Sequence, residues 1–313
     1  MGRGERGDLS DAEWERLRPF LPVSNGRRGR WRDHRQVIDG ILHRVRTGVH
    51  WRDLPERFGP WKTVSERHRR WSADGTWERL LQQVQAAADA AGEIDWDVSV
   101  DSTIVRAHQH AAGARTDPPL ALVGSKGGET LEHQDETPWQ SLVGRLAEVA
   151  REEGLGRSRG GFTSKIHLSA DGFCRPLSLI VTPGQRADCT QFVPVLEKIR
   201  VPRRRLGRPR KKPDSVAADK AYSNGPCRQY LRRRGIRHTI PEKADGQAAR
   251  LRRGSRGGRP PGFDEDRYKK RNTVERAVNK LKNFRAVATR YDKRGYVFLG
   301  TVTAAALVIW LRS

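Results

Sequence analysis

Residues 94–101, "IDWDVSVD", decide the fold class, because the hydrophobic pattern changes here from helical to alternating periodicity. Acidic or hydroxyl residues alternate with four apolar ones, which are Ile94, Trp96, Val98 and Val100. Such alternation is typical of a strand with one buried face and one polar face. Asp101 ends the stretch, so we expect its carboxylate on the polar face, at the end of the strand.

Four more strands are predicted C-terminal to this stretch. Residues 163–182, "TSKIHLSADGFCRPLSLIVT", indicate two strands joined by an Asp-Gly turn. A fourth strand, "SVAAD" at 215–219, ends on Asp219 and precedes a predicted helix at 224–235. "IRHTI" at 236–240 then indicates a fifth strand. Three strands, then strand, helix and strand, then helices, predict an α/β core.

The N-terminal region, residues 8 to about 92, has helical periodicity and is expected to form an all-α domain. "SDAE" at 10–13 and "TVSE" at 63–66 match the capping-box pattern of helix starts, and an apolar helix between them ends near Gly48. Residues 51–71 resemble a helix-turn-helix, although any helical bundle contains such turns. Its second helix carries three arginines that we expect to contact DNA, Arg67, Arg69 and Arg70.

The charge of the chain points to a polyanionic partner. Its 313 residues include 61 Lys and Arg against 37 Asp and Glu, a formal net charge of +24. Double-stranded DNA is the first candidate, and a membrane is disfavoured because the apolar stretch at 297–311 is too short for a span. Three cysteines are too few for a disulfide framework or a zinc knuckle, and no signal peptide is evident, so we expect a cytoplasmic protein.

Two basic tracts and one insertion interrupt the predicted elements. The tract at 200–213 has eight basic residues and no acid, and 250–262 is rich in Gly and Arg. Such runs are usually solvated, but in this chain we expect phosphate contacts. The residues assigned to DNA in the first tract are Arg203, Arg204, Arg205, Lys211 and Lys212. Residues 113–161 are rich in Gly, Pro and acids and contain one short predicted helix, at 138–152.

Residues 268–282, "YKKRNTVERAVNKLK", carry six cations and a single acid, Glu275. At about 100° per residue a helix would place four side chains within an arc of roughly 60°. These are Tyr268, Arg271, Glu275 and Lys282. An apolar face of Val274, Ala277, Val278 and Leu281 lies beside them, which predicts a site at the edge of the packing surface. The alternative is an ordinary Arg271–Glu275 pair on a solvated face, worth about 0.3–0.5 kcal/mol.

Asp101, Asp219 and Glu275 are candidate metal ligands. If the first and fourth strands are neighbours, the three acids converge at one end of the sheet. Mg²⁺ prefers oxygen ligands, and two such ions about 3.5–4 Å apart can activate an attacking oxygen and stabilise the leaving one. Each aspartate has the alternative role of capping the turn that follows it. His108 and His110 are interpreted as structural or DNA-facing, and Asp188 is a reserve carboxylate.

Tyr268, Arg271, Glu275 and Lys282 show the spacing Y-(2)-R-(3)-E-(6)-K, which resembles the signature of DDE transposases of bacterial insertion sequences, families four and five. "VDSTIVRAHQHAAGAR", "GRSRGGFTSKIHL", "ADKAYSN" and "RRGSRGGRPP" are also similar to the fifth-family pattern. The resemblance implies an RNase H-like catalytic core at 93–313, with a mixed sheet of about five strands and flanking helices. It also implies that Asp101, Asp219 and Glu275 bind two Mg²⁺, which Mn²⁺ can replace.

The same resemblance implies that Tyr268, Arg271 and Lys282 hold DNA, and that the protein assembles on DNA as a homodimer or larger homo-oligomer. We therefore expect a transposase that binds terminal inverted repeats, cuts the DNA and transfers the strands. A nuclease without strand transfer and a domesticated DNA-binding protein are the alternatives. The second is disfavoured because all three acids are intact.

Overall fold

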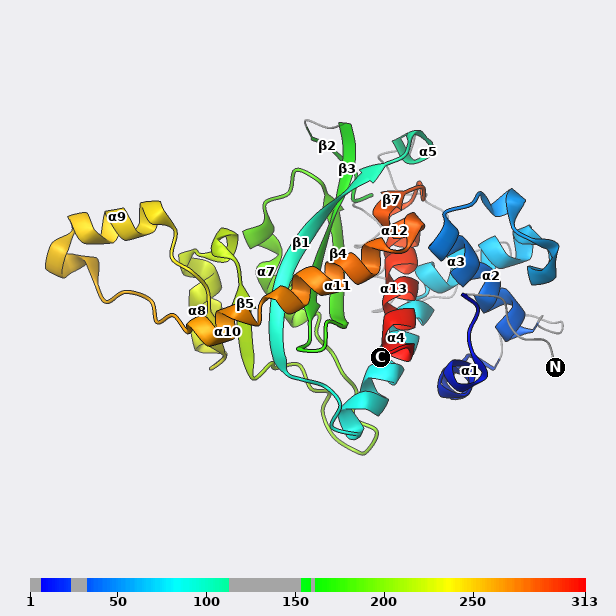
Figure 1. Ribbon diagram of the computed structural model, residues 1–313, viewed down its shortest axis with the longest axis horizontal. Coiled ribbons are helices and arrows are strands. Elements are labelled where there is room, and N and C mark those ends of the chain that lie inside the picture. Colours follow the sequence, from blue (N-terminus) through cyan, green and yellow to red (C-terminus); the bar gives the residue numbers. More distant parts are fainter. Residues whose placement is uncertain (1–6, 24–32, 113–152, 159–160) are drawn as a thin grey trace, which may run out of the picture.

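A mixed β-sheet forms the centre of the protein, with helices packed around it (Figure 1). The computed structural model describes residues 7–23, 33–112, 153–158 and 161–313. The strands are β1 (Asp97–Ala107), β2 (Gly156–Ser158), β3 (Gly161–Ala170), β4 (Pro176–Pro183), β5 (Ser215–Ala218), β6 (Arg237–Thr239) and β7 (Thr289–Arg290). The predicted α/β class and the five predicted strands are confirmed, and the predicted helix at 138–152 lies outside the described residues.

The sheet has the order β2-β3-β1-β5-β6, with β4 paired to β3 and β7 to β1. β1, β3 and β4 are antiparallel neighbours, whereas β5 and β6 continue the sheet in parallel on the other side of β1. The first and fourth predicted strands are therefore neighbours, which is the condition under which the three acids converge. The predicted end of the first strand was wrong. Pairing with β3 continues as far as Arg106, which places Asp101 in the middle of β1.

Four α-helices make up most of the described N-terminal region: α1 (Asp11–Leu17), α2 (His34–Thr47), α3 (Trp61–Ala73) and α4 (Thr76–Ala90). The capping box of Ser10 and Glu13 is present, and α2 ends at Gly48 in the left-handed conformation. The predicted capping box at Thr63 was wrong, because α3 already begins at Trp61, after Pro60. Short 3₁₀ turns, η1 (Arg18–Phe20), η2 (Trp51–Asp53) and η3 (Glu56–Phe58), complete the region. Two 3₁₀ turns, η2 and η3, therefore occupy the stretch where the first helix of a helix-turn-helix was predicted.

The remaining helices follow the strands. They are α5 (Gln109–Ala112), α7 (Asp188–Glu197), η4 (Lys220–Tyr222), α8 (Gly225–Arg233), α9 (Ala244–Arg252), η5 (Gly254–Gly257), α10 (Glu265–Lys269), α11 (Asn272–Lys282), α12 (Arg285–Ala288) and α13 (Gly295–Leu311). The predicted single helix at 268–282 is divided into α10 and α11. Around Arg271 the backbone forms tighter i to i−3 hydrogen bonds, although Lys270 and Arg271 keep helical angles, so the chain continues in one direction.

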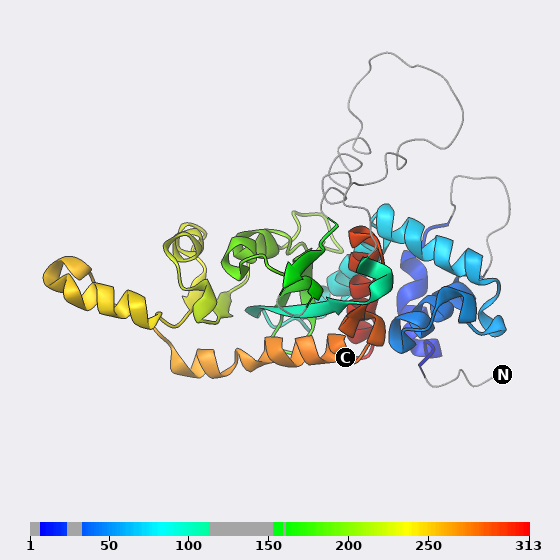
Figure 2. The same ribbon diagram turned by 90° about the horizontal axis from the view of Figure 1, so that it is seen from above.

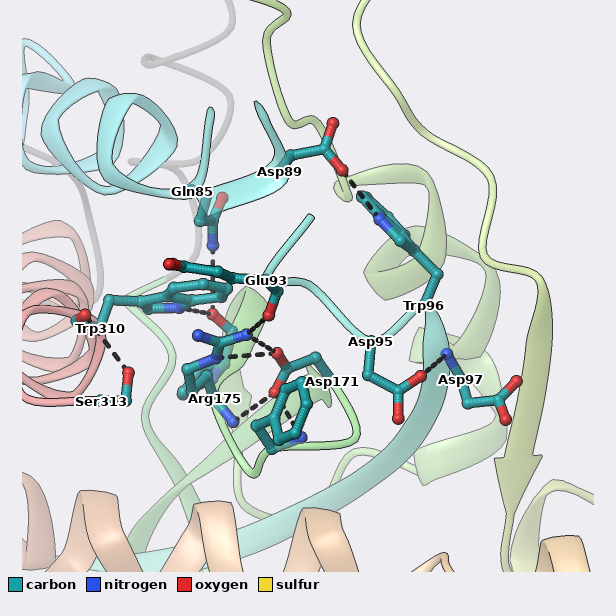
Figure 3. Close-up of polar contacts among 12 residues, drawn as sticks. Gln85, Asp89, Glu93, Asp95, Trp96, Asp97, Asp171, Arg175, Trp310 and Ser313 are labelled. Atoms are coloured by element: carbon teal, nitrogen blue, oxygen red, sulfur yellow. Dashed lines mark hydrogen bonds and ion pairs between the residues drawn. The ribbon is translucent and has the colours of Figure 1, made fainter. Parts of the chain in front are cut away.

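The C-terminal helix α13 joins the N-terminal helices to the sheet, because it packs on α3 and α4 and also on β4 (Figure 1). Nearly all of its residues are buried. Figure 3 shows one part of this junction, where Trp310 Nε1 and Gln85 Nε2 donate hydrogen bonds of 2.7 and 3.2 Å to the Pro176 carbonyl. Nearby, Arg175 pairs with the fully buried Asp171. The helical region and the sheet therefore share one core.

The apolar stretch at 297–311 is confirmed as part of a buried helix. Within the described parts of the chain, no helix is long and apolar enough to cross a membrane.

Candidate active site

Three different elements carry the three predicted acids. Asp101 lies in β1, Asp219 follows the last residue of β5, and Glu275 is in the first turn of α11. Val100 and Ala218 are paired in the parallel register, so the two aspartates follow neighbouring residues of the sheet. α11 packs across β1 and β3 through the predicted apolar residues, of which Val274, Ala277 and Leu281 are buried and Val278 is partly buried.

Electrostatics also indicate that the acids are close together. Burial raises the pKa of Asp101, and the negative charges of Asp219 and Glu275 raise it further, against the Ser102 N–H and Arg271. The Asp101 side chain is 23% exposed, whereas that of Glu275 is 47% exposed. The site is therefore a set of mutually repelling carboxylates that opens to solvent on the α11 side.

Arg271 lies between two of these acids. Its Nη1 is 3.3 Å from Asp101 Oδ2, and its Nη2 pairs with Glu275 Oε1. The guanidinium also lies 5.7 Å from the centre of the Tyr268 ring. Although burial alone would lower the pKa of Arg271, the neighbouring Glu275 and Asp101 raise it. The expected i, i+4 pair is thus present, and Arg271 also connects it to the sheet.

Asp219 has the capping role considered as its alternative, whereas Asp101 lies within β1 and has no turn after it to cap. Asp219 Oδ1 accepts a 2.9 Å hydrogen bond from the Ala221 N–H at the start of η4. Asp101 Oδ1 accepts a 2.8 Å bond from the Ser102 N–H. Each carboxylate therefore has one oxygen held by the backbone, which fixes its direction.

A fourth carboxylate, Asp188, lies behind the three acids at the start of α7. Its Oδ1 accepts a 2.7 Å hydrogen bond from Ser102 Oγ and lies 2.9 Å from Lys165 Nζ. His167 Nδ1 is 3.8 Å from the same oxygen, and burial lowers the pKa of His167 to about 4. The Tyr222 hydroxyl is also buried, and its pKa is strongly raised by burial and by the carboxylates Asp101, Asp188 and Asp219.

Lys165, His167 and Tyr222 were missed by the sequence analysis. One signal was available, because Lys165 and His167 are two residues apart and therefore place two ionisable side chains on the same face of β3. Asp188, the reserve carboxylate, contacts Ser102 and Lys165, and its reserve role stays a prediction.

Two family models match this chain. Residues 94–310 match a family described as "Transposase DDE domain", and residues 9–81 match one described as "Putative transposase of IS4/5 family". The chain belongs to the DDE transposase family. This assignment confirms the resemblance seen in the sequence.

Relatives of the transposase span parts of the chain. A putative transposase of insertion element IS6501 from Brucella ovis is 29% identical over 150 residues, 48% of this chain and 99% of its own length. A putative transposase of IS402 from Burkholderia cepacia is 33% identical over 138 residues, 44% of this chain and 57% of its own. The uncharacterized protein y4sN of Sinorhizobium fredii is 42% identical over 125 residues, 38% of this chain and 96% of its own. No solved structure matches the transposase.

The DDE family implies dependence on a divalent metal, and the donor set of the transposase fits one. Three carboxylates that offer oxygen ligands and repel one another are suited to Mg²⁺. In the described residues, however, no group of three or more His, Cys, Asp or Glu side chains is arranged as a ready metal cluster. Arg271 instead supplies the positive charge between Asp101 and Glu275.

The residues assigned to DNA lie in three parts of the chain: residues 268–282, the tract at 200–213 and α3. Tyr268 and Arg271 border the acids, and Lys282 is half-buried at the far end of α11. In the tract at 200–213, where Val201 and Arg210 form a β-bridge, all five assigned residues are exposed: Arg203, Arg204, Arg205, Lys211 and Lys212.

Arg67 differs from the other assigned arginines of α3. It is buried, lies 5.5 Å from the centre of the Trp71 ring and contacts His34 Nδ1 at 3.3 Å. Burial and Arg70 lower the pKa of Arg67 to about 10. Arg67 therefore contributes to the core of the helical region, and Arg69 and Arg70 are the residues of this set that reach the surface.

His108 and His110 do not join the acids. They follow the C-terminal end of β1. The centres of their two rings are 4.5 Å apart, and the centre of the His110 ring lies 5.1 Å from that of His50.

Proposed function

We propose that this transposase binds the ends of an insertion sequence, cleaves the DNA there and transfers the freed strands into target DNA. The observation that carries the proposal is the convergence of Asp101, Asp219 and Glu275 from β1, β5 and α11 beside Arg271. Carboxylates repel phosphate, so their grouping in a chain of charge +24 is best explained by metal-dependent phosphodiester chemistry.

We assign the binding of two Mg²⁺ ions, or Mn²⁺ in their place, to Asp101, Asp219 and Glu275. Bound metal would supply activation of the attacking oxygen and neutralisation of the leaving one. The residues of the chain orient the reaction: backbone N–H groups hold one oxygen of each aspartate, and Asp188 orders Ser102. When metal ions balance the charges of Asp101 and Glu275, the Arg271 guanidinium would be free to bind a DNA phosphate.

The sheet topology supports the RNase H-like core that the resemblance implied. An antiparallel set of β1, β3 and β4 is extended in parallel by β5 and β6, and the first two acids follow neighbouring positions of β1 and β5. We further propose that residues 1–92 recognise the inverted repeats and that 93–313 are catalytic. The two family matches support this division, since one ends at residue 81 and the other begins at 94.

The proposal is tested with Asp101→Asn, Asp219→Asn and Glu275→Gln, assayed for end binding and 3'-end cleavage on the same DNA. Each variant should bind the ends as the wild type does and lose cleavage, because ligands of one cluster act as a unit. Mn²⁺ should restore part of the activity of these variants. Wild-type cleavage by Glu275→Gln would show that Glu275 is only the helix partner of Arg271.

Paired ends and a target plasmid then separate transposition from hydrolysis. A wild-type protein that cuts the ends but never joins them to the plasmid would be a nuclease. Light scattering with and without end DNA tests the homodimer or larger homo-oligomer that we propose for the DNA-bound state.

A further inference from the structure

A cavity of about 600 Å³ lies at the edge of the sheet, next to the strand that leads to Asp219. Its walls come from α8, from β6 and from the segment before α10. Arg232, Arg237 and Phe263 are among the residues that line it. No family match or proposed site residue accounts for this cavity.

The cavity is lined by positive charges that form no ion pairs among the described residues. Arg232 and Arg237 are exposed, and neither has an ion pair among the described residues. By contrast, the buried Arg228 is held by the fold, because its Nη2 donates hydrogen bonds to the Ile240 and Pro241 carbonyls. The acid in the lining, Asp264, accepts a 2.9 Å hydrogen bond from the Arg267 N–H as the cap of α10. The charged groups of the cavity that remain available to a ligand are therefore the guanidinium groups of Arg232 and Arg237.

A row of side chains connects the cavity to the acids. Phe263 is 49% exposed, and its ring lies 5.2 Å from that of Tyr268. The Tyr268 ring in turn lies 5.7 Å from the guanidinium of Arg271, which contacts Asp101 and Glu275. A DNA strand that passes the acids along this row would meet an aromatic surface and then two guanidinium groups, the combination that binds nucleic-acid strands elsewhere.

The cavity and the N-terminal helices lie at opposite sides of the acids. Figures 1 and 2 both show α1 to α3 at one end of the protein and α8 to α10 at the other, with β1 and the beginning of α11 between them. Beyond the cavity, α9 extends away from the rest of the protein and has no buried residue. Four arginines at the end of α9 and in the segment after it are exposed: Arg252, Arg253, Arg256 and Arg259.

We infer that the cavity binds the DNA strand on the far side of the scissile phosphate from the recognised end, with Arg232 and Arg237 on its phosphates and Phe263 against its sugar and base surface. The inference rests on the proposed function, since it assumes that the N-terminal helices hold the end. It adds a binding site for flanking DNA. Contacts to phosphates would position this DNA without reading its sequence.

The test compares two DNA duplexes, one ending at the cleavage position and one continuing into flanking DNA. The dissociation constant of each is measured over a series of salt concentrations. Wild-type protein should bind the longer duplex more tightly and with a steeper salt dependence. Arg232→Ala and Arg237→Ala should each reduce that extra slope by about 1, and Phe263→Ala should weaken binding of the longer duplex without changing the slope.

Arg233→Ala is the matched control, because Arg233 is the next residue of α8, is also exposed and does not line the cavity. It should keep the full difference between the two duplexes. Equal effects of Arg232→Ala and Arg233→Ala, or equal wild-type binding of both duplexes, would overturn the inference and leave the proposed function standing. Failure of the wild-type protein to prefer end DNA over unrelated DNA would instead overturn the proposed function.

Discussion

At the scale of single residues, Arg271 is the centre of the candidate site. One guanidinium pairs with both Asp101 from the sheet and Glu275 from the helix, and the Arg271 and Asp101 side chains are 17% and 23% exposed. The spacing of Arg271 and Glu275 could be predicted from helix geometry. The contact with Asp101 could not, because 170 residues separate the two in the chain.

Arg271→Ala should lower the thermal stability of the metal-free protein, since Asp101 and Glu275 would then repel each other without a cation between them. Loss of a charge-assisted hydrogen bond costs about 1.5–3 kcal/mol, or several degrees in a protein of this size. Mg²⁺ should raise the melting temperature of the variant more than that of the wild type, because no arginine has to be displaced. Differential scanning fluorimetry in EDTA and in Mg²⁺ measures both effects.

Arg276→Ala is the control for this prediction, since Arg276 is exposed on the same helix and has no ion pair among the described residues. Equal Mg²⁺ responses in Arg271→Ala and Arg276→Ala would contradict the role given to Arg271.

At the scale of elements, α13 and α3 are joined by a buried polar chain. Trp77 Nε1 donates to His68 Nδ1 at 3.1 Å, His68 Nε2 lies 3.0 Å from Thr301 Oγ1, and Thr301 donates to Asp292. Since Nδ1 of His68 is an acceptor, its ring is neutral and Nε2 carries the proton. Asp292 also pairs with Arg44 of α2 at 2.9 Å, and Trp77 belongs to α4, so four helices meet at these side chains.

His68 should make the fold less stable in acid. Burial lowers the pKa of His68 from 6.5 to about 4, so the unfolded chain binds a proton at a higher pH than the folded protein does. Stability from this group is therefore complete above pH 6.5 and is lost as the pH falls toward 4, by about 3 kcal/mol in total. Urea denaturation between pH 7.5 and 4.5 should show a smaller pH dependence for His68→Gln than for the wild type. Identical slopes would mean that His68 is not buried as a neutral ring.

At the scale of the whole molecule, the helical region and the central sheet form one packing unit. Residues 9–81 match a separate family, yet α13 from the C-terminus packs on both α4 and β4. The predicted boundary at 92/93 thus lies between the two family matches. The hydrophobic core, however, contains residues from both sides of this boundary.

Deletion of residues 1–92 should consequently expose the apolar side of α13 and give a core that aggregates or binds a hydrophobic dye. Point variants are the better test of end recognition. Arg69→Ala and Arg70→Ala should each keep the melting temperature and reduce the salt slope of end binding by about 1. Arg67→Ala should instead lower the melting temperature, because Arg67 packs on Trp71. A well-folded deletion variant that still selects the ends would refute this account.

The sequence by itself determined the helical and strand periods, the buried face of α11, and the three acids as candidate ligands. These follow from local patterns, because periodicity and caps act within a few residues. Only the tertiary structure decided that Asp101 lies within β1, that Arg67 is buried, and that Arg271, Lys165 and Asp188 surround the acids. Strand length, burial and ion pairing depend on residues brought together from distant parts of the chain, and a linear pattern carries no record of those contacts.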